Sequence, residues 1–200
     1  MATETEIANL ALGHIAIGKT IANLDEKSEE ARTIKRIYDI AKNAVLRAFD
    51  WPFSTKILAL SLVEEEPNTE WAYSYRYPSD CLKIRRILSG LRNDTHQSRS
   101  RYKISQDTAG KLIFSDEEDA EAEYTAGGLS QQFWPEDFKL AFSFYIAFLV
   151  APTLTMGDPN KLGDRAFKLY EAMGTRAAAN SANEEQPDEI PEAESIRARD

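Results

Sequence analysis

The fold is decided by residues 134–151, which read WPEDFKLAFSFYIAFLVA. Pro135 suits the first position of a helix, and the two acids after it complement the positive end of the helix dipole. From Leu140 to Val150 the run is almost entirely apolar, so the helix has no solvated face and has to be covered on all sides. A membrane span needs about 20 apolar residues, and this run stops short of that at Ala151-Pro152.

The same run predicts the central helix of a bundle, or a helix buried partly by its own fold and partly by a neighbouring subunit. Pro152 is expected to end it. The residues that we expect to be buried or at an interface are Phe142, Tyr145, Ile146 and Leu149.

Further helices are expected on both sides of this run. Thr3 and Glu6 have the spacing of a capping box, which predicts a short first helix. Residues 28–49 repeat apolar positions at helical spacing, with Ser28 as the N-cap. After the apolar run, Asp158 and Pro159 resemble the N-cap and first residue of a last helix.

The middle of the chain has the period of a β-strand. Leu58, Leu60 and Leu62 alternate with smaller or polar residues, and a turn is expected at residues 66–68. A second alternating row forms an aromatic face on its strand: Trp71, Tyr73, Tyr75 and Tyr77. This row is typical of a sheet core, but together with Arg76 it also fits a surface that stacks unpaired nucleobases.

Together these patterns predict an α+β fold, in which an antiparallel helical bundle carries an inserted antiparallel β-sheet subdomain and a flexible C-terminal tail. We place the first part of the bundle at residues 1–53 and the β subdomain at residues 54–127. The second part of the bundle follows at residues 128–180, and a flexible acidic tail with a terminal docking peptide at residues 181–200. Glu, Pro, Asp and Asn dominate this tail, and such a composition cannot repay the entropy of ordering by itself.

Charge and cysteine content narrow the classes of function. The net charge is −9, and residues 181–200 alone carry seven acidic and two basic residues. A dedicated phosphate-backbone binder would instead concentrate Lys and Arg on one face. Cys81 is the one cysteine, which favours a reducing compartment. The acidic N-terminus lacks the basic and apolar regions of a signal peptide.

Several short segments carry a resemblance through their order and spacing. They are residues 11–13, 21–26, 28–31, 45–47, 51–53, 71–78, 158–159 and 169–171, and the terminal Arg197-Ala198-Arg199. In this order they resemble the head-to-tail adaptor proteins of short-tailed bacteriophages, often named tail tubular protein A. The resemblance extends over most of the chain. Relatives often have an aromatic residue near the terminal arginines, where this chain has Ile196.

The resemblance implies a structural protein of the virion tail or neck, assembled in the cytoplasm of the host bacterium. Twelve copies would form a ring between the portal protein and the tail nozzle protein, with tail fibres as a further partner. Duplex DNA would pass through the channel without specific binding, and a lumen of mixed or negative charge would let it slide. No membrane, cofactor, metal or catalytic group is expected.

A second class of function is a cell-wall glycan hydrolase, as a main or secondary activity of a tail protein. Two acidic runs, residues 64–66 and 116–119, contain the carboxylates that a glycosidase pairs. Acidic runs in turns are more often solvated, and adjacent acids do not create the apolar pocket that raises one pKa above the other. His14 and His96 are too isolated to indicate a metal site.

The terminal peptide is the candidate docking site for a partner. Its residues are Ile196, Arg197 and Arg199. The arginines are suited to pair with carboxylates, and Ile196 to fill an apolar notch on the portal or on a neighbouring subunit. Repetition around a ring would strengthen even a weak contact of this kind.

Overall fold

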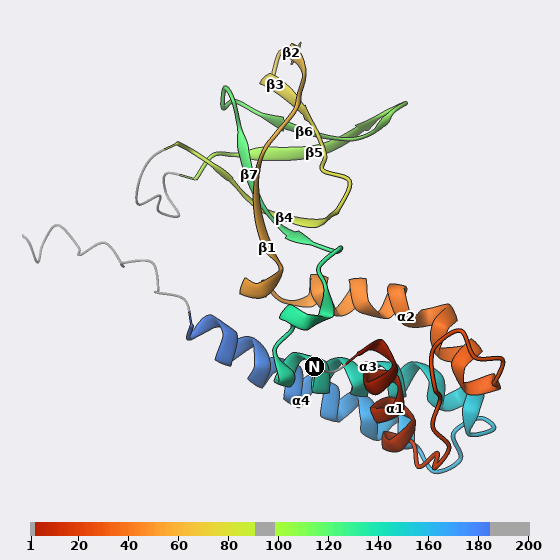
Figure 1. The fold of residues 1–200 in the computed structure, drawn as a ribbon. Coiled ribbons are helices and arrows are strands. Elements are labelled where there is room, and N and C mark those ends of the chain that lie inside the picture. The colour runs from red at the N-terminus through yellow and green to blue at the C-terminus, as the bar shows by residue number, and fades with distance from the viewer. Residues whose placement is uncertain (1–2, 91–98, 185–200) are drawn as a thin grey trace, which may run out of the picture.

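The structure is a computed structural model, which describes residues 3–90 and 99–184. These residues form an α+β fold with four α-helices and two antiparallel sheets, so the predicted fold class is confirmed at this level. The helices lie together at one end of the molecule and the strands at the other (Figure 1). The helices are α1 (Glu4–His14), α2 (Glu29–Ala48), α3 (Glu136–Leu154) and α4 (Leu162–Ala182). The strands are β1 (Thr55–Ala59), β2 (Leu62–Asn68), β3 (Trp71–Arg76), β4 (Cys81–Leu88), β5 (Tyr102–Asp107), β6 (Gly110–Ser115) and β7 (Glu121–Ala126).

Helix α3 is the centre of the helical part, because α1, α2 and α4 all pack against it. Phe138, Phe142 and Ile146 are fully buried in the core that these helices share. Tyr145 and Leu149 are half-buried beside that core, and the Tyr145 ring lies 4.8 Å from the ring of Tyr170 on α4. The apolar run is therefore covered mainly by elements of its own chain.

The ends of α3 differ from the sequence prediction. Pro135 is the N-cap and not the first helical residue, and the helix continues through Pro152 to Leu154. The prediction that Pro152 ends the helix was wrong. A proline inside a helix removes one backbone hydrogen bond, and the Thr155 N–H bond to the Ala151 carbonyl closes the last turn beyond it. With these extra residues α3 is long and apolar enough to cross a membrane, but 56% of its apolar window is buried inside the structure.

The N-terminal caps of α1 and α2 agree with the sequence. Thr3 and Glu6 form the predicted capping box, and the Ser28 hydroxyl accepts from the Ala31 N–H. Helix α4 begins later than predicted, at Leu162 instead of Pro159. The carboxylate of Asp158 still caps it, since its two oxygens accept from the N–H groups of Leu162 and Gly163 at 2.7 Å.

The strands form two sheets and not the single sheet that the sequence predicts. Their orders are β1-β7-β4 and β2-β3-β6-β5. The chain changes sheet at Leu60-Ser61, where the Leu60 N–H donates to Ala120 and the Ser61 carbonyl accepts from the Arg76 N–H. Leu58, Leu60 and Leu62 therefore do not belong to one half-buried strand, as their alternation predicted. The turn predicted at residues 66–68 lies inside β2, which has a register shift there.

Arg85 on β4 connects the two parts of the molecule. Its guanidinium donates to the Trp51 carbonyl at 2.7 Å, to the Thr55 hydroxyl at 2.6 Å and to the Thr125 hydroxyl at 3.0 Å. Trp51 follows α2 and is buried in the helical core, whereas Thr125 lies on β7. One side chain, 8% exposed, thus fixes the end of α2 against two strands of the first sheet.

His14 packs between α1 and α3. Its ring stacks on Phe144 with the centroids 3.8 Å apart, and its Nε2 lies 3.0 Å from the Ser143 hydroxyl. That hydroxyl donates to the Leu140 carbonyl at 2.7 Å, so it can accept from a neutral imidazole N–H. Burial lowers the pKa of His14 below its ordinary value of 6.5.

We expect the free energy of unfolding to fall as the pH is lowered through 6.5. The unfolded chain binds the His14 proton at a higher pH than the folded chain does, so protonation favours unfolding. Urea titrations between pH 5 and 7.5 measure this slope. The His14→Gln variant should show a shallower slope over the same range; equal slopes would exclude a contribution from His14.

Candidate interaction surface

The aromatic row on β3 is part of the sheet core. Tyr75 is 1% exposed and its hydroxyl donates to the Glu117 carbonyl at 2.6 Å, and Tyr73 and Tyr77 pack against the same core. Trp71 is also buried, with the guanidinium of Arg101 4.4 Å from its ring centroid. Arg76 pairs with both carboxylate oxygens of Asp107 at 2.9 Å. The buried rings of Trp71 and Tyr75 therefore offer no face on which a nucleobase could stack.

The two acidic runs converge in space, although about 50 positions separate them in the sequence. The pKa of Tyr73 is raised, first by the carboxylate of Glu118, then by burial and by the nearby Glu65, Asp119 and Glu66. The strand register agrees, because Tyr73 lies opposite Glu65 of the first run and opposite Ser115, which directly precedes the second run. Sequence reasoning missed this convergence, because it depends on how β2 and the β6–β7 turn are placed in the fold.

One of these runs borders a pocket of about 440 Å³. The described residues that line it are Leu88, Ser89, Gly90, Glu117, Glu118, Asp119 and Glu121. Glu117 accepts a hydrogen bond from the Ser100 hydroxyl. A glycosidase needs one carboxyl held in apolar surroundings, which raise its pKa. Leu88 is the one large apolar side chain among these lining residues, so it alone could supply such surroundings here. Within residues 3–90 and 99–184, no group of His, Cys, Asp or Glu could hold a metal ion.

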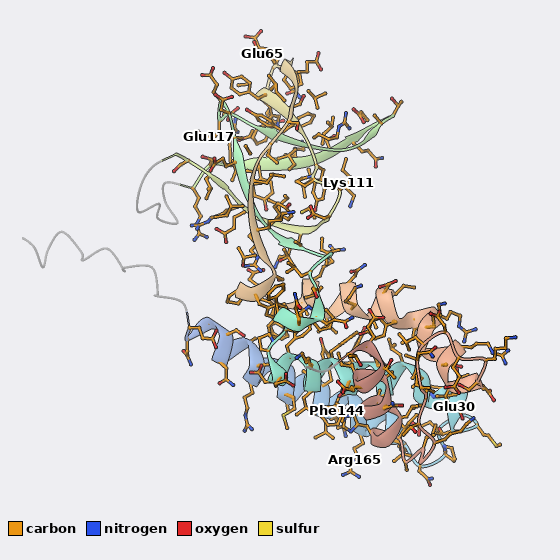
Figure 2. The ribbon with its side chains drawn as sticks, in the orientation of Figure 1. Glu30, Glu65, Lys111, Glu117, Phe144 and Arg165 are labelled. Carbon is orange, nitrogen blue, oxygen red and sulfur yellow. The ribbon has the colours of Figure 1, made fainter. Side chains whose placement is uncertain are left out.

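A second surface combines exposed aliphatic side chains with carboxylates. Four aliphatic residues on β1 and β2 are 43–55% exposed, and three exposed glutamates follow them in β2. We call this surface the β1–β2 edge: Ile57, Leu58, Leu62, Val63, Glu64, Glu65 and Glu66. Each of the two strands ends the order of its sheet. Figure 2 shows Glu65 at the tip of the β part, pointing away from the rest of the molecule.

The β1–β2 edge has the properties of a site that binds another protein chain. Unpaired edge strands in soluble proteins are usually blunted by charge, bulges or cover, because they can pair with another chain. Here the carboxylates and a bulge follow the aliphatic residues but leave them exposed. The prediction that Leu58 and Leu62 face inward, which rested on their alternation, was wrong. An exposed strand with aliphatic residues on both faces has the same local pattern as a buried one.

Ile196, Arg197 and Arg199 lie outside the described residues. The same holds for His96.

No family model matches the chain, and no curated protein matches it.

Proposed function

We propose that this protein is a structural connector, which acts through the surfaces that it presents to other proteins and not through chemistry. The observation that carries the proposal is the β1–β2 edge, where aliphatic side chains stand exposed on the edge strands of the two sheets. Exposed apolar groups of this kind are a cost to a free monomer and a gain when a partner covers them. The Arg85 contacts join β1, the first strand of this edge, to the chain that follows α2.

In this proposal the protein is the head-to-tail adaptor of a short-tailed phage virion. A ring of twelve copies lies between portal and tail nozzle, with tail fibres as neighbours and duplex DNA passing through its centre. The antiparallel helical bundle forms the body of each subunit, and the flexible C-terminal tail reaches a partner. The resemblance of the sequence to these adaptors supports the assignment, and so does the covered central helix α3, which gives each copy a rigid body.

The test measures mass and enzymatic activity on the same preparation. We expect size-exclusion chromatography with light scattering to show a multimer of the 22.5 kDa chain when portal protein is added. We expect no clearing of a peptidoglycan suspension by that multimer. Absence of any complex with portal at micromolar concentrations would contradict the proposal.

The second candidate function is a cell-wall glycan hydrolase, and the acidic pocket of about 440 Å³ beside Leu88 is the observation that favours it. Clearing of peptidoglycan that is lost in both Glu117→Gln and Glu118→Gln would establish this activity. Clearing that survives both changes would point away from the pocket.

A further inference from the structure

The free side of β2 is suited to an extended peptide of defined character. β2 pairs with β3 on one side and ends the order of its sheet, so within the described chain its other side has no strand partner. Its residues run from aliphatic to acidic: Leu62 and Val63 are half-exposed, and three exposed glutamates follow. A peptide that adds to a sheet edge gains backbone hydrogen bonds, and its side chains provide specificity. The matching peptide has an aliphatic residue followed by cations.

The chain itself contains such a peptide at its end. Residues 195–199 read SIRAR, an aliphatic residue followed by two arginines at alternate positions. Placed parallel to β2 with Ile196 beside Val63, this peptide has Arg197 beside Glu64 and Arg199 beside Glu66. The order of aliphatic and charged residues therefore agrees at three positions. Arginine–carboxylate pairs add direction as well as affinity.

We propose that the C-terminal peptide of one copy docks on the β1–β2 edge of another copy. α4 ends in the helical part, whereas β2 lies at the tip of the β part, as Figure 1 shows. Residues 185–194 connect Glu184, two residues after the end of α4, to the peptide. Ten extended residues span about 35 Å, which suits an edge presented by an adjacent molecule. The inference rests on the proposed assembly of many copies and names one contact within it.

A head-to-tail contact of this kind has consequences for assembly. Each copy has one peptide and one acceptor edge, so the contact is heterologous and closes a ring when the rotation between copies permits it. Each added copy converts later contacts into intramolecular ones, where a flexible linker supplies an effective concentration near the millimolar range. A weak individual contact is therefore sufficient once several copies are in place.

The first experiment measures the contact without portal protein, so that its failure and the failure of the adaptor function are distinguishable. A fluorescent peptide of residues 186–200 is titrated with full-length protein that carries Ile196→Ser, Arg197→Ser and Arg199→Ser, and anisotropy is recorded. We expect saturable binding that weakens at least about ten-fold when the receptor also carries Glu64→Lys and Glu66→Lys, the two acids placed beside the arginines. A peptide with Arg197→Glu and Arg199→Glu should bind that second receptor again.

The matched control changes the same charge elsewhere. Glu171 and Glu184 are exposed acids on or just after α4, and their replacement by Lys should leave the affinity within about two-fold. Circular dichroism confirms that all receptors are folded. The proposal is overturned if the peptide does not bind at about 1 mM, the effective concentration of a tethered segment. It is equally overturned if the lysine substitutions in the edge and the control substitutions at Glu171 and Glu184 weaken binding by the same factor.

The second experiment decides between contact within a copy and contact between copies. One full-length chain carries the serine substitutions in its peptide, and the other carries Glu64→Lys and Glu66→Lys in its edge. Each chain lacks one half of the contact, so neither should self-associate. Their mixture should form a one-to-one complex that grows no further, detected by energy transfer between dyes on the two chains. No transfer in the mixture, at concentrations where the peptide binds the edge, would overturn docking between copies.

Discussion

The Phe138→Ala variant is expected to lose about 3–5 kcal/mol of its free energy of unfolding, the cost of removing a large aromatic side chain from a closed core. Phe138 is fully buried. Its ring lies 4.9 Å from Trp51, 4.8 Å from Phe53 and 5.1 Å from Trp134, centroid to centroid. These rings come from the end of α2, from the turn before β1 and from the start of α3. The cavity left by the missing ring would therefore weaken the packing of all three segments against α3.

Denaturant titration followed by far-UV circular dichroism measures this loss. Tryptophan emission gives a second readout, because two of the three tryptophans contact Phe138 and should shift to longer wavelength when water reaches them. Phe133→Ala is the matched control, since Phe133 is 63% exposed, and its effect should stay within about 0.5 kcal/mol. Equal losses in the two variants would show that α3 is not the centre of the core.

The sequence predicted the features that depend on neighbouring residues. The capping box of Thr3 and Glu6 and the N-cap of Ser28 require only a few residues and were found as predicted. The apolar run indicated the buried helix because a continuous stretch of large apolar residues can be satisfied in few ways. The start of α4 was missed for a local reason. Asp158 caps the helix from four residues before its first residue, by a turn that includes Lys161 in the left-handed region.

The features that the sequence did not predict depend on distant parts of the chain. Leu58 and Leu62 lie on the edge strands of two different sheets, and only the pairing of β1 with β7 and of β2 with β3 shows this. The acidic runs meet because both lie at the same end of the β part. The aromatic row was predicted to lie in the sheet core, whereas the exposed aliphatic residues of the free strand edge were not recognised. Alternation along a strand indicates which residues share a face, but not whether that face is covered.

The Arg85→Ala variant is expected to lose about 3 kcal/mol and to loosen the junction between helices and sheets. Removing a nearly buried guanidinium leaves acceptors without their charged donor, and hydrogen bonds to charged groups contribute about 1.5–3 kcal/mol. The Ser54 and Thr55 hydroxyls each use their single proton in a hydrogen bond to the Trp51 carbonyl. Neither hydroxyl can therefore donate to another acceptor of the guanidinium without breaking its bond to Trp51. Lysine at this position keeps the charge but not the planar fork that reaches three acceptors. Arg85→Lys should therefore recover less than half of the loss.

Hydrogen exchange distinguishes a local loosening from a general loss of stability. If Arg85 fixes the sheet against α2, amides near the end of α2 and in β1 and β7 should exchange faster in Arg85→Ala than amides in the middle of α3. Lys83→Ala on the same strand is the control. Its ion pair with Asp50 is solvent-exposed on both sides, and such pairs contribute about 0–1 kcal/mol. If amide exchange is faster by the same factor in the helical part and in the β part, Arg85 stabilises the whole fold and not the junction. The position of the β1–β2 edge would then depend on the sheets alone.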